Sequence, residues 1–414
     1  MTSNKYSIIN NLTSALKSQT KAQKRLFLLY TFLFIPQSIL ILRSVGVRLG
    51  LSAVAPFFGL IFTTITFLIC FKSITRQIRF NDIVFIIAIV VIYFASALIF
   101  PATAPYSIDN ASYFFLTCLP MYFVGLTIKQ DTSREMFVIL AYLALILQIV
   151  FLSVLGMGVN EEGEELNELM TTAYSFLPFV LFLLWYAFEH GGIWSYVFAL
   201  IGVFILMALG TRGPILCMIA FIALFLLFFK RFKRNLLIKT LIVLLAGVFL
   251  LFSNEIVFFL GHLAQSLGLS TRVFDSFIQN EMININESNG RDDIWNQTFS
   301  YLIKNKVLLG EGLYSDRIIN GTSQYSHNFE LELFCTFGLL GGLIIIFLLT
   351  RIIYRAFKKV RGIDCSIIVL IFFCSSIIQL QFSGSFLKSK VFWFFLGICI
   401  SMNRSPIIKR EGMN

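Results

Sequence analysis

The sequence is poor in charge: only 13% of its 414 residues are Asp, Glu, Lys or Arg, and only three are histidine. A soluble domain carries about 25% charged residues. Hydrophobic residues make up 57% of the chain and its mean hydropathy is +0.83, which is more apolar material than a water-facing surface can accommodate. This composition excludes a soluble enzyme and a disordered protein. The seven cysteines lie in or beside apolar runs with no C-x-x-C spacing, which predicts small core residues rather than metal ligands or disulfides.

Apolar runs recur along the whole chain, so a single membrane anchor is excluded and an all-α polytopic membrane protein is predicted. A helix that spans a bilayer needs about 20 mainly apolar residues. Twelve runs approach this template, at 26–42, 51–71, 83–100, 111–128, 136–155, 173–188, 193–209, 214–229, 236–252, 329–349, 367–380 and 391–402. Only 210–213 separates the seventh run from the eighth, so a short re-entrant pair is the alternative there.

The basic residues alternate with these runs. With the N-terminus in the cytoplasm, most of the 33 lysines and arginines fall in cytoplasmic segments, as the positive-inside rule requires. Both termini, 1–25 and 403–414, are therefore predicted to be cytoplasmic. This asymmetry accounts for most of the net charge of +11, so no nucleic-acid partner is needed. The polar, basic first 25 residues predict no cleavable signal peptide.

Two membrane regions, 26–252 and 329–402, enclose one long extracytoplasmic segment at 253–328. Long ordered loops on a membrane scaffold commonly carry function. Helix-spaced Trp295, Phe299 and Leu302 favour an ordered loop over an unstructured linker. A second outer segment, 156–170, holds five glutamates without a basic residue, and it is interpreted as a solvated acidic turn, with a charge gate as the alternative.

Three arginines on the predicted outer side are candidates for binding an anion. Arg212 lies between glycines, and Pro214 can open the next helix, which leaves free backbone N–H groups beside the guanidinium. Arg291 stands at an expected helix start whose two following aspartates are interpreted as helix caps, and Arg272 is a third candidate. Forked donors of this kind can clamp a diphosphate. For Arg212 the alternative is a side chain that snorkels to the interface.

His327 stands where the long outer segment enters the tenth run. Histidine is the side chain best suited to exchange a proton near neutral pH. Glu330 and Glu332 follow it, and Glu330, at i+3, is the better candidate to orient the imidazole. The alternative is that His327 caps the helix; His190 and His262 are interpreted as structural.

Short motifs follow one another in the second half of the chain, and all lie on or near the predicted outer side. They are Thr211-Arg212-Gly213, Gly290-Arg291 with Trp295, Gly310-x-Gly312, His327-Asn328-x-x-Leu331-Glu332 and Phe337-Gly338-Leu339-Leu340-Gly341. In order and spacing they resemble the O-antigen ligase / O-antigen polymerase family over about 210–342. The first five runs carry no such motif.

The resemblance implies a GT-C-like membrane fold of about 12 helices with one long periplasmic loop, in the bacterial cytoplasmic (inner) membrane. It implies inverting transfer of a saccharide from undecaprenyl diphosphate, without metal or cofactor. By analogy, Arg212 and Arg291 hold the diphosphate, Arg272 and Glu330 contribute to substrate binding, and His327 deprotonates or orients the acceptor hydroxyl. The expected partners are the lipid-linked oligosaccharide, the bilayer, a chain-length regulator and a flippase.

Several activities fit this framework. The Ile-, Phe-, Lys- and Asn-rich composition favours a polymerase of lipid-linked repeat units, for O-antigen or capsule, over a ligase that transfers glycan to lipid A–core. A transporter or flippase would place broken or charged segments near the midplane, often in both halves, and the first half has no counterpart to 210–214. A cell-wall glycan polymerase would carry an acidic signature in an outer loop, which we do not find.

The predicted topology can be tested with reporter tags. Tags inserted at Glu162 and Asn286 should report the outside, and tags at Lys233 and Lys358 should report the cytoplasm. A cytoplasmic signal from Asn286 would contradict the functional interpretation, because the lipid-linked donor is presented at the outer face.

Overall fold

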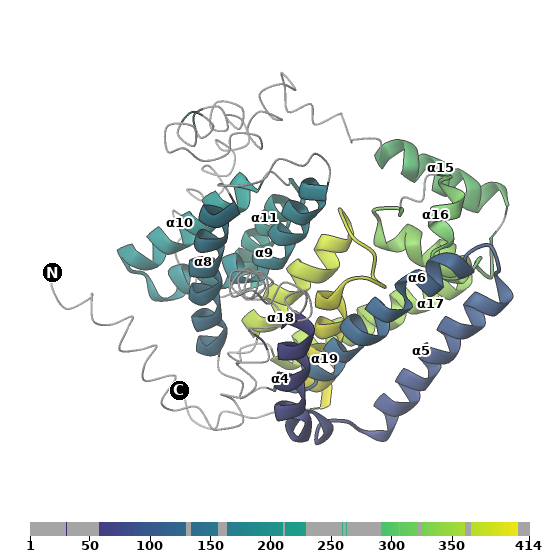
Figure 1. The fold of residues 1–414 in the computed structure, drawn as a ribbon, viewed down its shortest axis with the longest axis horizontal. Helices are drawn as coiled ribbons and strands as arrows, with labels where there is room; N and C mark the ends of the chain where they lie inside the picture. Colours follow the sequence, from purple (N-terminus) through teal and green to yellow (C-terminus); the bar gives the residue numbers. More distant parts are fainter. Residues whose placement is uncertain are drawn as a thin grey trace. The chain divides into compact units, whose positions relative to one another are not determined.

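The computed structural model describes residues 30, 58–129, 134–155, 164–209, 212–228, 259, 262, 291–305, 307–321, 325–360 and 366–404 (Figure 1). All regular structure within these ranges is helical. The chain divides into two compact units: unit 1 comprises 1–71 and 133–285, and unit 2 comprises 72–132 and 286–414. Helix α4 (Phe58–Thr75) contains the boundary at residue 71.

Helices occupy ten of the twelve predicted apolar runs, while 26–42 and 236–252 lie largely or wholly outside the described residues. Within the described ranges three helical stretches are long and apolar enough to cross a membrane, namely Phe80–Ile99, Thr171–His190 and Phe329–Val360. The all-α membrane architecture is therefore supported. The count of twelve spans stays a prediction, and so does the re-entrant alternative for the seventh and eighth runs.

Unit 1 is built around one buried helix. Its described helices outside the boundary are α8 (Arg134–Leu155), α9 (Glu164–His190), α10 (Ile193–Ala208) and α11 (Arg212–Phe228). Helix α9 contacts the other three helices, and 83% of its most apolar stretch, within Thr171–His190, is buried. The Phe137 and Phe182 rings stack between α8 and α9 with centroids 5.1 Å apart. Burial on all sides explains why this run is apolar around its circumference.

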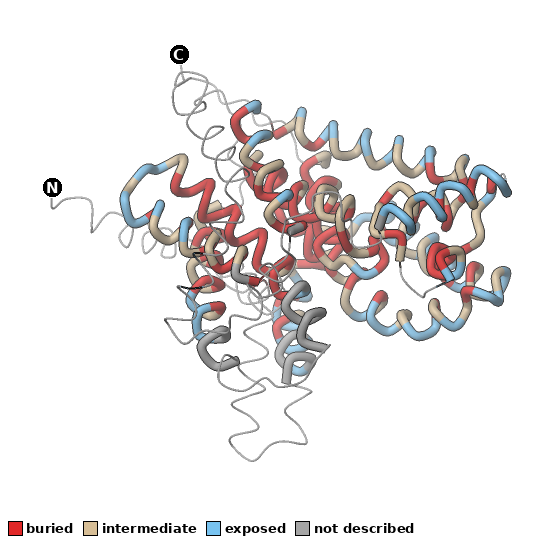
Figure 2. Tube along the Cα trace, turned by 90° about the horizontal axis from the view of Figure 1, so that it is seen from above, coloured by how far each residue is buried: buried red, intermediate tan, exposed pale blue. Residues whose placement is uncertain are grey.

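Unit 2 combines an early and a late part of the chain. It contains α5 (Phe80–Ile99), α6 (Ala104–Tyr113), the π-helical turn η2 (Phe114–Cys118), α7 (Leu119–Gly125), α15 (Arg291–Lys304), α16 (Ser315–Ile319), α17 (Phe329–Val360), α18 (Ser366–Phe373), the π-helical turn η4 (Cys374–Ile378) and α19 (Lys390–Arg404). Helix α19 packs against α7, α17 and α18. Its residues 391–399 are all buried, and Figure 2 shows such runs of buried residues in red.

Helices α7 and α19 approach each other backbone to backbone. A Cβ placed on Gly125 would overlap the carbonyl oxygen of Phe394, and one on Gly397 would overlap that of Tyr122. Small residues at a crossing let two helices come this close, and dispersion contacts then hold them together where lipid supplies no hydrophobic driving force.

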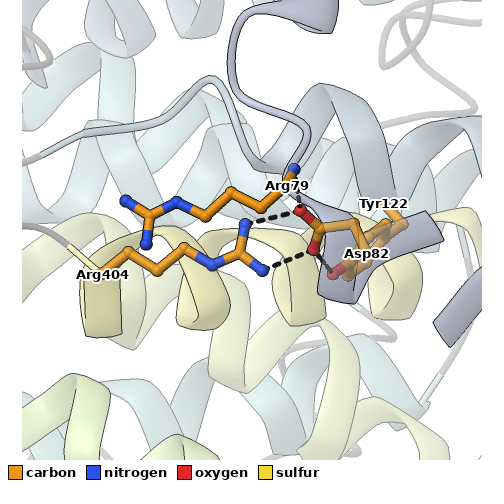
Figure 3. A network of polar contacts seen from close by, with 4 residues as sticks. All are labelled: Arg79, Asp82, Tyr122 and Arg404. Carbon is orange, nitrogen blue, oxygen red and sulfur yellow. Dashed lines mark hydrogen bonds and ion pairs between the residues drawn. The ribbon is translucent and has the colours of Figure 1, made fainter. Parts of the chain in front are cut away.

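One acidic side chain joins three helices of unit 2 (Figure 3). Asp82, near the start of α5, accepts a bidentate pair of hydrogen bonds from the Arg404 guanidinium of α19, at 2.7 and 2.6 Å. It also accepts a hydrogen bond from Tyr122 Oη of α7 at 2.5 Å and one from the Arg79 backbone N–H at 2.7 Å. The carboxylate is fully buried, so these donors replace the water that it loses.

Helix α17 bends at Gly338, whose backbone is left-handed and extended (φ 74°, ψ 173°). Beyond the bend, the N–H groups of Leu339 and Leu340 donate out of the helix. Their acceptors are the carbonyls of Val307 and Leu308, at 3.1 and 3.3 Å. The segment 307–312 therefore takes the place of the preceding helical turn for these two donors.

The same segment satisfies the carbonyls that the bend leaves behind. In a regular helix the carbonyls of Cys335 and Thr336 would accept from residues 339 and 340. Here they accept from the backbone N–H groups of Glu311 and Gly312, at 2.9 and 3.3 Å. All four of these backbone groups thus find a partner, as buried backbone requires.

Two glycines permit this exchange because the backbones touch. A Cβ on Gly310 (φ 78°) would overlap the carbonyl oxygen of Thr336 and the amide nitrogen of Gly338, and a Cβ on Gly338 would overlap the carbonyl oxygen of Leu308. The Gly310-x-Gly312 and Phe337-Gly338 motifs therefore have a structural role in the interlock between the segment 307–312 and α17.

The substitution Gly310→Ala should lower the free energy of unfolding more than Gly321→Ala. Both glycines have a left-handed backbone, but a Cβ on Gly321 meets nothing within 4 Å. Alanine in this conformation costs about 1–2 kcal/mol at either site, and overpacking adds about 1–3 kcal/mol at Gly310 only. Thermal unfolding in detergent should show the difference. Equal losses at the two sites would contradict the interlock.

Candidate functional site

The start of α17 places His327 on a defined piece of backbone. Asn328 Oδ1 accepts a hydrogen bond from the N–H of Leu331 at 3.0 Å, so Asn328 is the residue that caps the helix. His327 precedes the cap and has a left-handed backbone with φ 51°. A residue other than glycine rarely adopts this conformation, and such strain concentrates at functional sites. The residue that caps the helix is therefore Asn328 and not His327.

The imidazole of His327 lies against an aromatic ring. The ring centroids of His327 and Tyr325 are 3.9 Å apart. Tyr325 is itself anchored, because its Oη accepts a weak hydrogen bond from the backbone N–H of Gly384 at 3.4 Å. The segment between η4 and α19 thereby supports the ring against which the histidine packs.

Helix α15 approaches His327 through its first turns. Trp295 Nε1 donates to the carbonyl oxygen of Ser326, the residue before His327, at 2.8 Å. Arg291 is the first residue of α15, one turn before Trp295 and about 6 Å from it along the helix axis. The start of α15 and the His327-Asn328 motif, which are far apart in the sequence, are therefore brought to one neighbourhood of unit 2.

Helix α15 lies beside α16 (Figure 1), and further hydrogen bonds fix it against the segments that follow it. Thr298 Oγ1 bonds with Asn320 Oδ1 at 2.8 Å, just after α16. Tyr301 Oη donates to Glu311 Oε1 at 2.8 Å, and this hydrogen bond raises the pKa of Tyr301 to about 12. Helix α15 is thus bonded to the same segment, 307–312, that supplies hydrogen-bond partners at the bend in α17.

The two glutamates after His327 are engaged with the segment between η4 and α19. Glu330 Oε1 accepts a hydrogen bond from Gln381 Nε2 at 3.0 Å. Glu332 is buried, and its carboxylate accepts from Ser385 Oγ and from the backbone N–H of Phe386, the latter at 3.1 Å. The predicted role of Glu330 in orienting the imidazole remains a prediction, and the observed bonds give both acids a role in docking this segment.

Asp316 of α16, which the sequence patterns did not single out, connects α16 to the backbone beside His327. Its Oδ2 accepts a hydrogen bond from the N–H of Ser326 at 2.7 Å. Burial raises the pKa of the Asp316 carboxyl above its ordinary value, while the Ser326 hydrogen bond and the charge of Arg317 act in the opposite direction. Trp295 and Asp316 therefore hold Ser326 from two sides.

The other predicted arginines are placed unequally. Arg212 opens α11 in unit 1, and a Cβ on the following Gly213 would overlap the Tyr174 hydroxyl, which explains the glycine there. Arg272 lies outside the described residues. Because Arg212 and Arg291 belong to different units, their shared diphosphate site remains a prediction.

The arrangement in unit 2 offers a proton acceptor and hydrogen-bond donors beside a helix start. Within the ranges that the structure describes, no three His, Cys, Asp or Glu side chains gather as a metal site would require. A histidine held on strained backbone next to an arginine-bearing helix suits chemistry in which a hydroxyl loses a proton and an anionic group is bound.

The comparisons with known proteins agree with the sequence motifs. Residues 197–346 match a protein-family model described as O-Antigen ligase. No curated protein and no solved structure matches the chain. The matched segment includes α11, α15, α16 and the first half of α17, and so it contains Arg212, Arg291, Asp316 and His327.

Proposed function

Because the chain is O-antigen ligase/polymerase-like over residues 197–346, we propose that it polymerises undecaprenyl-diphosphate-linked oligosaccharide repeat units. The reaction takes place at the outer face of the cytoplasmic membrane and yields O-antigen or capsule. The family and the apolar helices indicate a membrane enzyme of the glycosyltransferase kind. The observation that supports the site most strongly is the strained backbone of His327 beside the Asn328 cap.

In the proposed mechanism His327 accepts a proton from, or orients, the acceptor hydroxyl. The hydroxyl oxygen attacks the anomeric carbon of the donor sugar, and the bond to the diphosphate oxygen breaks with inversion. Arg291 and Arg212 stabilise the charge that builds up on the departing diphosphate. The Trp295–Ser326 hydrogen bond supports this assignment for Arg291, because it brings the arginine-bearing helix to the histidine.

A ligase is the second candidate, because the matching family model is described as O-Antigen ligase. The two enzymes share donor and chemistry and differ in the acceptor. A polymerase adds the glycan to another lipid-linked repeat unit, whereas a ligase adds it to lipid A–core.

Surface polysaccharide from a deletion strain separates the two activities. Loss of the polymerase should remove the ladder of chain lengths and leave a single repeat unit attached. Long chains that accumulate on the lipid carrier would instead show that the chain is a ligase. A ladder identical to that of the parent strain, with no accumulated intermediate, would contradict both.

The substitution His327→Asn should abolish polymer while the protein is still expressed and inserted. Asparagine tolerates a left-handed backbone better than most residues, so the change removes the imidazole and keeps the local conformation. A general base contributes about 10²–10⁴-fold in rate, enough to erase a ladder on a gel. The matched control is His190→Asn, since His190 stacks on Tyr186 in unit 1. Normal polymer from His327→Asn would assign His327 a structural role.

A further inference from the structure

Arg317 of α16 is a buried arginine that none of the sequence motifs contains. Only 7% of its surface is exposed. Its guanidinium lies over the ring of Tyr314, 4.7 Å from the centroid, and near the ring of Tyr106 at 5.7 Å. Tyr314 has a left-handed backbone (φ 64°) and is itself buried. Two aromatic faces thus hold the planar group in one orientation, as aromatic rings do for arginine.

This guanidinium makes no hydrogen bond or ion pair with a residue that the structure describes. Its buried Nε has no hydrogen-bond partner there, and neither does the buried Oγ of the nearby Ser315. The ion pairs found in the described ranges join Arg134 to Glu135 and Arg404 to Asp82. A buried charge without a direct partner is costly, and proteins commonly retain it where a ligand supplies the partner.

The carboxylates that face Arg317 have other commitments. Asp316 accepts from Ser326, and Glu332 accepts from Ser385 and Phe386, so each acid holds a neighbouring segment in place. Both interact electrostatically with Arg317, and Asp316 also accepts a hydrogen bond from the Arg317 backbone N–H, but neither acid bonds to the guanidinium. The Nε–H of the guanidinium has no partner among the described residues and therefore remains available for an external acceptor.

A second cation lies on a segment that is hydrogen-bonded to the start of α17. Lys388 lies in the segment between η4 and α19, which Glu332 and Tyr325 hold against the start of α17. Lys388 is exposed but partly desolvated, and this desolvation, followed by the repulsion from Arg317, lowers the pKa of its ammonium. Two positive charges close enough to repel each other are typical of a site for an anion.

We propose that Arg317 and Lys388 form a second anion-binding site, beside His327, for an acidic group of the lipid-linked glycan. The inference rests on the proposed function. The ligand is an oxyanion, either the carboxylate of an acidic sugar or a phosphate of the lipid carrier, and both fit a forked guanidinium. In the predicted topology Tyr106, Arg317 and Lys388 all lie on the outer side, where the substrate is presented.

Binding to the full-length protein in nanodiscs tests the site. The probes are glucuronate and inorganic pyrophosphate, with glucose as the neutral comparison, and titration calorimetry gives the affinities. Arg317→Gln and Lys388→Gln should each weaken at least one acidic probe, by about tenfold or more for the arginine, because a charge-assisted bond is lost. The matched control Arg351→Gln, on an exposed position of α17, should change neither.

The probe that responds identifies the source of the anion. A response confined to glucuronate supports an acidic sugar, and one confined to pyrophosphate supports the lipid phosphate. The proposal is overturned if the unchanged protein binds neither probe, or if both variants bind as it does, or if Arg351→Gln weakens binding equally. Lys388 is exposed, so Lys388→Gln keeps the test decisive if Arg317→Gln does not fold.

The same proteins separate this inference from the proposed function. Binding that depends on Arg317 in a protein that makes no polymer would uphold the anion site and overturn the proposed function. If the protein forms polymer but its anion binding does not depend on Arg317, the proposed function is upheld and the anion site is overturned.

Discussion

The backbone exchange between α17 and the segment 307–312 is the constraint from which the candidate site follows. At Gly338 the helix cannot satisfy its own amides and carbonyls, and this segment provides all four missing partners. Because the segment leads directly into α16, its position determines where Arg317 and Asp316 lie. Asp316 then holds Ser326, and His327 follows. A bend in a long apolar helix thereby positions side chains at the start of that helix.

The sequence located the helices well because their cause is local. An apolar run of sufficient length in a bilayer must form a helix, since every backbone group needs an internal partner. The same reasoning could not interpret Gly310-x-Gly312 or Gly338, which it identified only as parts of the family motifs. Their role depends on a contact between two backbones about 28 residues apart, and single-sequence patterns carry no information on such contacts.

The candidate site was predictable to the extent that it uses rare residues at element boundaries. His327 stands out because it is one of three histidines and lies where the long segment enters an apolar run, and Arg291 stands out because it lies at an expected helix start. Arg317 gave no such signal, since it occurs in an ordinary polar stretch. One hint was available: it lies among tyrosine and isoleucine residues, which is unusual for a solvated arginine. For Glu330, spacing alone suggested a contact with the imidazole, which stays a prediction, and the bond to Gln381 could not be read from the sequence.

The ion pair between Asp82 and Arg404 has a consequence for biogenesis. The two residues are 322 positions apart in the chain, so Arg404 is synthesised long after Asp82. Helices α5 and α7 therefore exist before the guanidinium that neutralises their shared carboxylate. Until then Asp82 can keep its charge only in contact with water, because a buried carboxylate needs a partner. The synthesis of α19 is thus the step that allows this end of unit 2 to close around Asp82.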